Sequence, residues 1–185
     1  MKFRTSHFAL ALAGAALATG SVAIAGQTKM VGGAAMYPTK DIVDNAVNSK
    51  DHTTLVAAVK AAGLVDTLKS PGPFTVFAPT NAAFAKLPAG TVDTLLKPEN
   101  KGTLTAVLTY HVVPGKMMAA DIAAKAKANG GKLDLTTVQG EKITLSMRGN
   151  GWIVTDAKGG TSNITIADVA QKNGVIHVVD TVLMP

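Results

Sequence analysis

The stretch Thr75-Val76-Phe77-Ala78-Pro79-Thr80-Asn81-Ala82-Ala83-Phe84 decides how this chain folds. Together with the preceding Phe74, its first residues are aromatic and β-branched, which favours a strand. Pro79 ends that strand, and Thr80 can cap a short helix that continues through Phe84. The stretch therefore predicts a buried strand followed directly by a short helix.

The end of the chain supplies a second strand, Val175-Ile176-His177-Val178-Val179. Its residues are apolar at both odd and even positions, which predicts a central strand with both faces covered. Before it, Ile143, Leu145 and Met147 alternate with polar residues, as in a half-buried strand. Glycine-rich segments suited to hairpin turns separate such runs: Gln139-Gly140, Arg148-Gly149-Asn150-Gly151 and Lys158-Gly159-Gly160. We therefore expect an antiparallel meander that leads into the central strand.

The residues before Phe74 have apolar side chains at helical spacing. Asp41–Val47 and Asp51–Ala62 predict two helices, and Gly63 is placed to end the second. Pro71-Gly72-Pro73 must break the short helix that follows. Residues 26–40, which include several glycines, predict a flexible lead into the first helix. Thr91–Leu96 and Thr103–Leu108 predict further short helices. These patterns together predict one α+β domain over residues 41–185.

Three ordered motifs resemble those of the fasciclin domain family. Thr75 to Phe84 is similar to the family's first signature, and Tyr110-His111-Val112-Val113 to its tyrosine-histidine segment. Asn173 to Asp180, with Leu183 and Pro185, is similar to the second signature. The resemblance extends from about Asp41 to Pro185. It implies a wedge-shaped β-sandwich with short helices packed on it.

The resemblance also implies a function in adhesion or protein interaction at a cell surface. In animal relatives, integrin recognition is linked to the tyrosine-histidine segment and to an acidic-hydrophobic stretch before the second signature. Tyr110 and His111 are retained here, and Asp168 followed by Val169 keeps part of the second pattern. Tyr110, His111 and Asp168 are therefore the candidate partner-binding residues that the resemblance implies.

Two of the histidines lie in apolar surroundings, where a structural role competes with a functional one. His177 lies within the central strand, so its imidazole needs a hydrogen-bond partner. Thr80 and Asn81 of the first signature are the partners that we expect. His111 begins an apolar strand after a helix, and it serves either as a buried hydrogen-bonding group or as part of a recognition surface.

The sequence contains no pattern for catalysis or for a metal or cofactor site. There is no Gly-x-Ser-x-Gly motif, no His-Glu-x-x-His motif and no EF-hand loop. There is also no cysteine, which excludes thiol catalysis and thiolate zinc sites. We expect a protein that is not an enzyme and that has no catalytic residue, metal or cofactor.

The first 25 residues have the pattern of a signal peptide. Lys2 and Arg4 precede a short apolar run that ends in Ala23-Ile24-Ala25, a small-x-small cleavage pattern. After cleavage, no segment has the length and hydropathy of a membrane span. We therefore expect an exported protein, periplasmic or extracellular. The remaining basic residues are scattered, which gives no support for nucleic-acid binding.

Two functions remain open at this point. The first is adhesion to a protein or polysaccharide of a cell surface, matrix or envelope, by a monomer or a weak homo-oligomer. The alternative is a carrier of a small apolar ligand, a lipid or a pigment, in an apolar groove. Phe74, Phe77, Phe84 and Trp152 are the residues that we expect to line such a groove.

We predict cleavage after Ala25. Intact-mass spectrometry of the exported protein should show a chain that begins at Gly26. A chain that still begins at Met1 would contradict the prediction.

Overall fold

The computed structural model describes residues 27–185, so the expected signal peptide lies outside the described residues. Two interior strands of its main sheet pair with each other, β3 (Phe74–Pro79) and β9 (Gly174–Val179). They run parallel, with Phe74 opposite Gly174 and Pro79 opposite Val179. All of β9 is buried. The strand expected at residues 74–78 and the central position expected for residues 175–179 are both confirmed.

Five further strands complete a seven-stranded sheet in the order β4-β3-β9-β8-β7-β6-β5. They are β4 (Val112–Pro114), β5 (Lys132–Thr136), β6 (Lys142–Arg148), β7 (Gly151–Thr155) and β8 (Thr161–Gln171). From β5 to β9 each strand is antiparallel to the next, which confirms the expected meander. The Val138 N–H donates to the Val112 carbonyl at 2.8 Å. This bond ties the turn after β5 back to β4, so the sheet is nearly closed.

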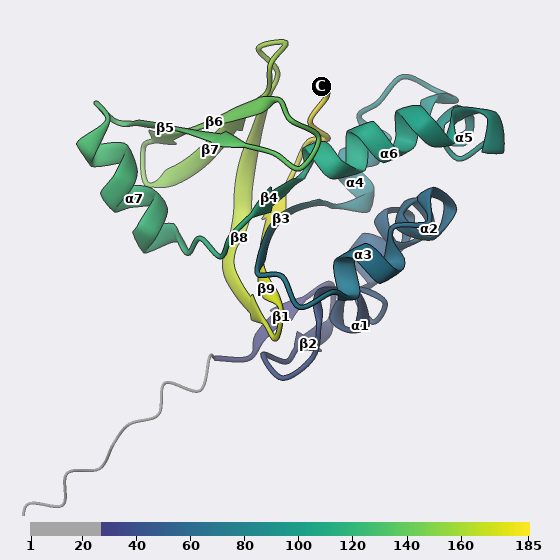
Figure 1. The fold of residues 1–185 in the computed structure, drawn as a ribbon, viewed down its shortest axis with the longest axis horizontal. Coiled ribbons are helices and arrows are strands. Elements are labelled where there is room, and N and C mark those ends of the chain that lie inside the picture. The colour runs from purple at the N-terminus through teal and green to yellow at the C-terminus, as the bar shows by residue number, and fades with distance from the viewer. Residues whose placement is uncertain (1–26) are drawn as a thin grey trace, which may run out of the picture.

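Short helices flank the sheet on two sides (Figure 1). One group comprises α1 (Ile42–Ala46), α2 (Thr53–Ala62), α3 (Val65–Lys69), α4 (Asn81–Ala85), α5 (Thr91–Leu95) and α6 (Lys101–Tyr110). Two 3₁₀ turns, η1 (Lys50–His52) and η2 (Pro98–Asn100), lie between them. The helix α7 (Ala119–Ala128) lies apart from this group, beside the β5–β7 strands. The arrangement is α+β, as expected, although α7 was not anticipated.

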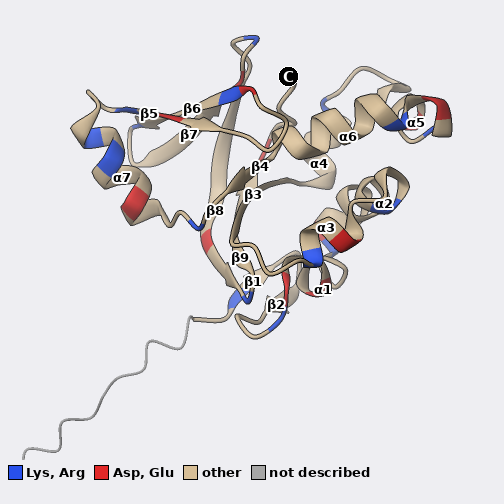
Figure 2. Cartoon of the chain, in the orientation of Figure 1, with Lys and Arg blue, Asp and Glu red and all other residues tan. Residues whose placement is uncertain are grey.

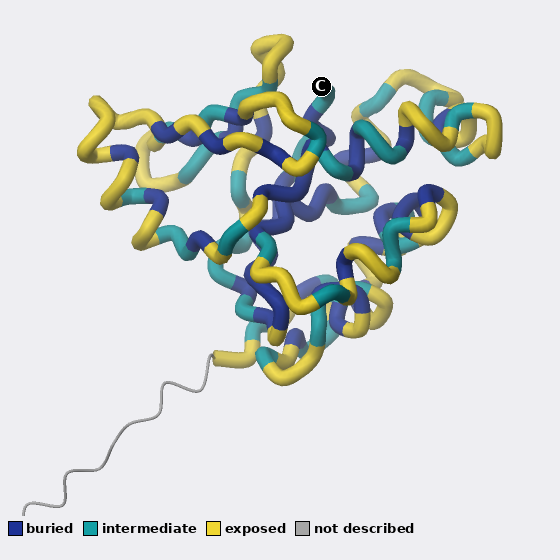
Figure 3. The backbone as a smooth tube through the Cα atoms, in the orientation of Figure 1, coloured by how far each residue is buried: buried dark blue, intermediate teal, exposed yellow. Residues whose placement is uncertain are grey.

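The hydrophobic core has two parts, which meet at β3 and β9. Val76 and Ile176 belong to the part beneath α1 to α6. Phe77 and Val179 belong to the part beneath α7, which also contains Ile122. Figure 3 shows the buried backbone concentrated where these strands cross the centre of the molecule. Neighbouring residues of one strand thus fill opposite cores, which explains why both parities are apolar.

Residues 27–40 are not the flexible lead that we expected for residues 26–40. They contain a β-hairpin of β1 (Lys29–Val31) and β2 (Ala34–Met36). Gly32 and Gly33 both have positive φ and form its two-residue turn. Val31 and Met36 are each only 2% exposed and join the first core. The glycines are thus the tight turn of an ordered hairpin, because residues on both sides of them bury apolar surface.

Gly174 marks the closest approach of the two central strands. A Cβ atom at this position would collide with the Phe74 carbonyl, which is backbone and cannot swing aside. We expect Gly174→Ala to lower the free energy of unfolding by about 1–3 kcal/mol. Urea denaturation measures the change.

The matched control is Gly102→Ala in α6, where a Cβ would meet no atom within 4 Å. That change should raise stability by up to about 1 kcal/mol, because alanine favours a helix over glycine. Equal effects of the two substitutions would contradict the role assigned to Gly174.

Candidate functional site

Tyr110, the last residue of α6, is fully buried. Its hydroxyl donates to the Lys142 carbonyl and accepts from the Ala157 N–H, both at 2.9 Å. Burial raises the pKa of this phenol, so the group stays neutral. The side chain therefore joins α6 to β6 and to the turn between β7 and β8.

His111 directly follows α6 and is 2% exposed. Its Nδ1–H donates to the Val107 carbonyl at 2.8 Å, and Nε2 accepts from the Leu183 N–H at 3.0 Å. This pair of bonds fixes a single neutral tautomer. Burial lowers the pKa of His111 to about 4. The ring thus attaches the C-terminal segment to α6.

His177 also makes two hydrogen bonds, but not to the residues that we expected. Its Nε2–H donates to the Met117 carbonyl at 2.8 Å, and Nδ1 accepts from the Asp168 N–H at 3.3 Å. The ring stacks on Phe77 with 5.6 Å between the ring centroids. Burial lowers the pKa of His177. The imidazole joins β9 to the segment before α7 and to β8.

Thr80 and Asn81, the partners expected for His177, bond elsewhere, so that expectation is wrong. The Thr80 hydroxyl accepts from the Ala83 N–H and caps α4. The Asn81 amide accepts from the Thr54 N–H and donates to the Lys50 carbonyl. Both residues lie past the end of β3, and their local bonds start α4 and fix α2 beside it.

Asp168 has a backbone conformation that is rare for a residue other than glycine, with φ at 57°. It lies in β8 where the pairing with β9 shifts between Ile166 and Val169. Its carboxylate accepts from the Ala119 N–H, at the first residue of α7, at 2.6 Å. A carboxylate at this end of a helix is stabilising. Asp168 therefore positions α7 on the sheet.

The three candidate partner-binding residues do not form a common surface. The rings of Tyr110 and His111 are buried, and the described structure offers neither of them to a partner. The Asp168 carboxylate is partly buried and bonded to α7. In this arrangement all three hold elements of the fold together.

A partly exposed row of apolar side chains lies on β6, β7 and β8 instead. Met147 of β6 lies directly opposite Trp152 of β7 and is 58% exposed. Trp152 and Ile164 of β8 are only partly covered by the second core. We call Met147, Trp152 and Ile164 the apolar row. The sequence pattern marked Met147 only as a strand residue, because alternation alone does not show where a covering helix ends.

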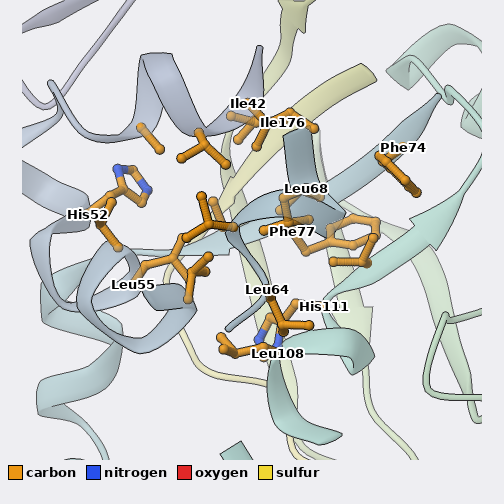
Figure 4. A pocket seen from close by; sticks show the side chains of 18 of the residues that line it. Ile42, His52, Leu55, Leu64, Leu68, Phe74, Phe77, Leu108, His111 and Ile176 are labelled. Atoms are coloured by element: carbon orange, nitrogen blue, oxygen red, sulfur yellow. The ribbon is translucent and has the colours of Figure 1, made fainter. Parts of the chain in front are cut away.

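A separate apolar pocket of about 80 Å³ lies between the first group of helices and the sheet. Phe74 and Phe77 line it, as we expected for a carrier groove, whereas Phe84 and Trp152 do not. Its wall takes side chains from α1, α2, α3, α6 and β9 (Figure 4). Among those labelled there are Ile42, Leu55, Leu64, Leu68, Leu108 and Ile176.

Within residues 27–185, no helix has both the length and the apolar character needed to cross a membrane. Within the same range, no three His, Asp or Glu side chains are grouped so that they could hold a metal ion.

We predict that stability falls as the pH drops below about 6.5. The pKa of His111 is about 4 when folded and about 6.5 when unfolded, so the unfolded chain binds the extra proton between these values. This one group should remove about 3 kcal/mol by pH 4, and stability is fully restored above pH 6.5. Urea denaturation at a series of pH values checks the loss.

His111→Gln is the control, because it keeps a hydrogen-bonding side chain that does not titrate. Its stability should depend less on pH between 6.5 and 4 than that of the natural protein. Parallel pH profiles for the two proteins would contradict the assignment.

Comparison with known proteins gives the same family as the motifs. The model of the fasciclin domain matches residues 50–185. The protein sll1483 of Synechocystis is 44% identical over 182 residues, which covers 95% of this chain and 93% of that relative. The cell surface glycolipoprotein MPB83 of Mycobacterium bovis is 37% identical over 147 residues, covering 76% of this chain and 58% of that protein.

A solved structure shares the fold. A domain pair from the insect cell adhesion molecule Fasciclin I superposes with a TM-score of 0.70 at 18% sequence identity. The match covers 79% of this chain and 51% of that one, so the chain spans about half the length of the pair. The family-model match over residues 50–185 and the relative sll1483 show that the chain belongs to the fasciclin domain family.

Proposed function

We propose that this protein is an exported, non-catalytic interaction module that binds a protein or polysaccharide of a cell surface, matrix or envelope. The observation that carries the proposal is the apolar row, Met147, Trp152 and Ile164, on β6, β7 and β8. The chain has a single tryptophan, and that residue lies partly uncovered in the row. Tryptophan is enriched among the residues that dominate binding energy at interfaces.

The chemistry of the row suits either kind of partner. Trp152 offers a flat apolar ring with one N–H donor, which can pack on a protein side chain or on a sugar ring. Met147 beside it is flexible and adapts to an irregular surface. In Figure 2 the basic and acidic residues are distributed over many elements of the ribbon.

Named relatives support a role at the cell surface. MPB83 is described as a cell surface glycolipoprotein, and Fasciclin I as a cell adhesion molecule. We extend that role to this chain together with the predicted export, in the periplasm or outside the cell. Each copy has a single apolar row among its described residues. We therefore propose a monomer or a weakly associating oligomer, whose overall affinity for a surface rises when many copies are displayed close together.

Ligand carriage is a second candidate function, which a different observation favours. The pocket between the helices and the sheet is apolar and is lined by Phe74 and Phe77. It lies in the first core and the row borders the second, so the two functions can be tested separately.

The test of the interaction module is a pull-down from envelope and matrix extracts with residues 26–185. The Met147→Ser/Trp152→Ala variant should lose the partner that the natural protein captures, with affinity reduced tenfold or more. Tyr37→Ser is the matched control, because Tyr37 is also exposed, at 46%, but lies outside the row. Equal capture by all three folded proteins would contradict the proposed surface.

A further inference from the structure

The pocket between α1, α2, α3, α6 and the sheet offers a ligand almost no polar surface. Its wall includes Val59 together with Leu55, Leu64 and Leu68, and the last three lie around one cavity in Figure 4. A volume of about 80 Å³ holds roughly five to eight water-sized groups. Water gains few hydrogen bonds in such a site, so a hydrocarbon group is the favoured occupant.

The two histidines at the pocket do not change this chemistry. His111 uses both ring nitrogens in hydrogen bonds to backbone groups. Nδ1 of His52 bonds to the Ser49 hydroxyl at 2.8 Å, whereas Nε2 makes no hydrogen bond and is covered by neighbouring atoms. Burial lowers the pKa of His52, and the Ala78 carbonyl partly opposes that shift. Neither ring therefore presents a polar atom to the cavity.

A single charged side chain borders the pocket among the described residues, and it is a cation. Lys60 lies near the C-terminal end of α2 and is exposed. The ion pairs found in residues 27–185 join Lys69 to Asp44 and Lys86 to Asp180, so none of them involves Lys60. No aspartate or glutamate belongs to the pocket wall. The charge at the rim therefore favours an anionic group on the ligand.

We propose that the pocket binds the hydrocarbon chain of an aliphatic carboxylate, with the carboxylate outside the rim beside Lys60. The apolar wall selects the chain, and the lysine selects the acid over the corresponding alcohol or amine. This inference rests on the second candidate function, ligand carriage, and adds the chemical class of the ligand.

Octanoate, 1-octanol and octylammonium are the probes, since they share one chain and differ in the charge of the head group. Isothermal titration calorimetry should show octanoate binding most tightly, then octanol, then octylammonium. Hexanoate should bind more weakly than octanoate, by roughly fourfold for each buried methylene that is lost. Titration should shift the methyl NMR signals of Leu55, Val59 and Leu64, which line the cavity.

Lys60→Gln removes the charge but keeps most of the side chain. It should weaken octanoate about threefold to fivefold, as expected for an exposed ion pair, and leave octanol unchanged. Lys125→Gln on α7 is the matched control, because Lys125 is also exposed but does not border the pocket, and it should change neither affinity.

The outcomes separate the inference from the function on which it rests. If no probe binds or moves these methyl signals, both ligand carriage and the carboxylate specificity are wrong. If octanol binds as tightly as octanoate, or Lys60→Gln changes neither affinity, carriage stands and the proposed class of ligand is wrong. Preference for octylammonium would likewise overturn the class.

Discussion

The parallel pairing of β3 with β9 is the constraint on which the rest of the structure depends. Each strand has core on both faces, so neither can move without disturbing both parts of the core. β4 attaches to one side of the pair and β8 to the other, and through β8 the β5–β7 strands are attached. The close approach at Gly174 sets the position of one strand against the other. Helices on both sides then pack on a surface whose register is already fixed.

Buried polar side chains attach the surrounding segments to this pair. His111 attaches the C-terminal segment to α6, and His177 attaches β9 to the segment before α7. Both rings are neutral, since burial lowers their pKa values and each accepts one hydrogen bond while donating another. A buried network whose members are all satisfied favours one arrangement over its competitors. The polar residues of the family motifs therefore act here as part of the architecture.

The features that could be predicted best are those that short-range sequence patterns determine. Alternation and glycine turns placed the meander, and residues 175–179, apolar at both parities, indicated a strand covered on both faces. The strand that pairs with residues 175–179 could not be predicted, because parallel pairing joins distant segments without a local turn signal. The hairpin at residues 29–36 was not predicted, because two consecutive glycines occur both in flexible segments and in tight turns.

Side-chain partners were the least predictable features. His177 was expected to bond to Thr80 or Asn81, but the short segment between β4 and α7 brings the Met117 carbonyl to the ring instead. Asp168 was singled out from a motif, yet its bond to the Ala119 N–H depends on a shift in the pairing of β8 with β9. Phe74 and Phe77 line the pocket as expected, whereas Phe84 lies elsewhere in the first core and Trp152 packs against the second.

The order of the strands has a consequence for synthesis. Phe74 pairs with Gly174, so α1 to α6 lack a complete sheet to pack on until the final strand has left the ribosome. Contacts between residues so far apart in sequence also slow folding. The proposed export would benefit from this delay, because the topology itself postpones compaction until most of the chain has been made.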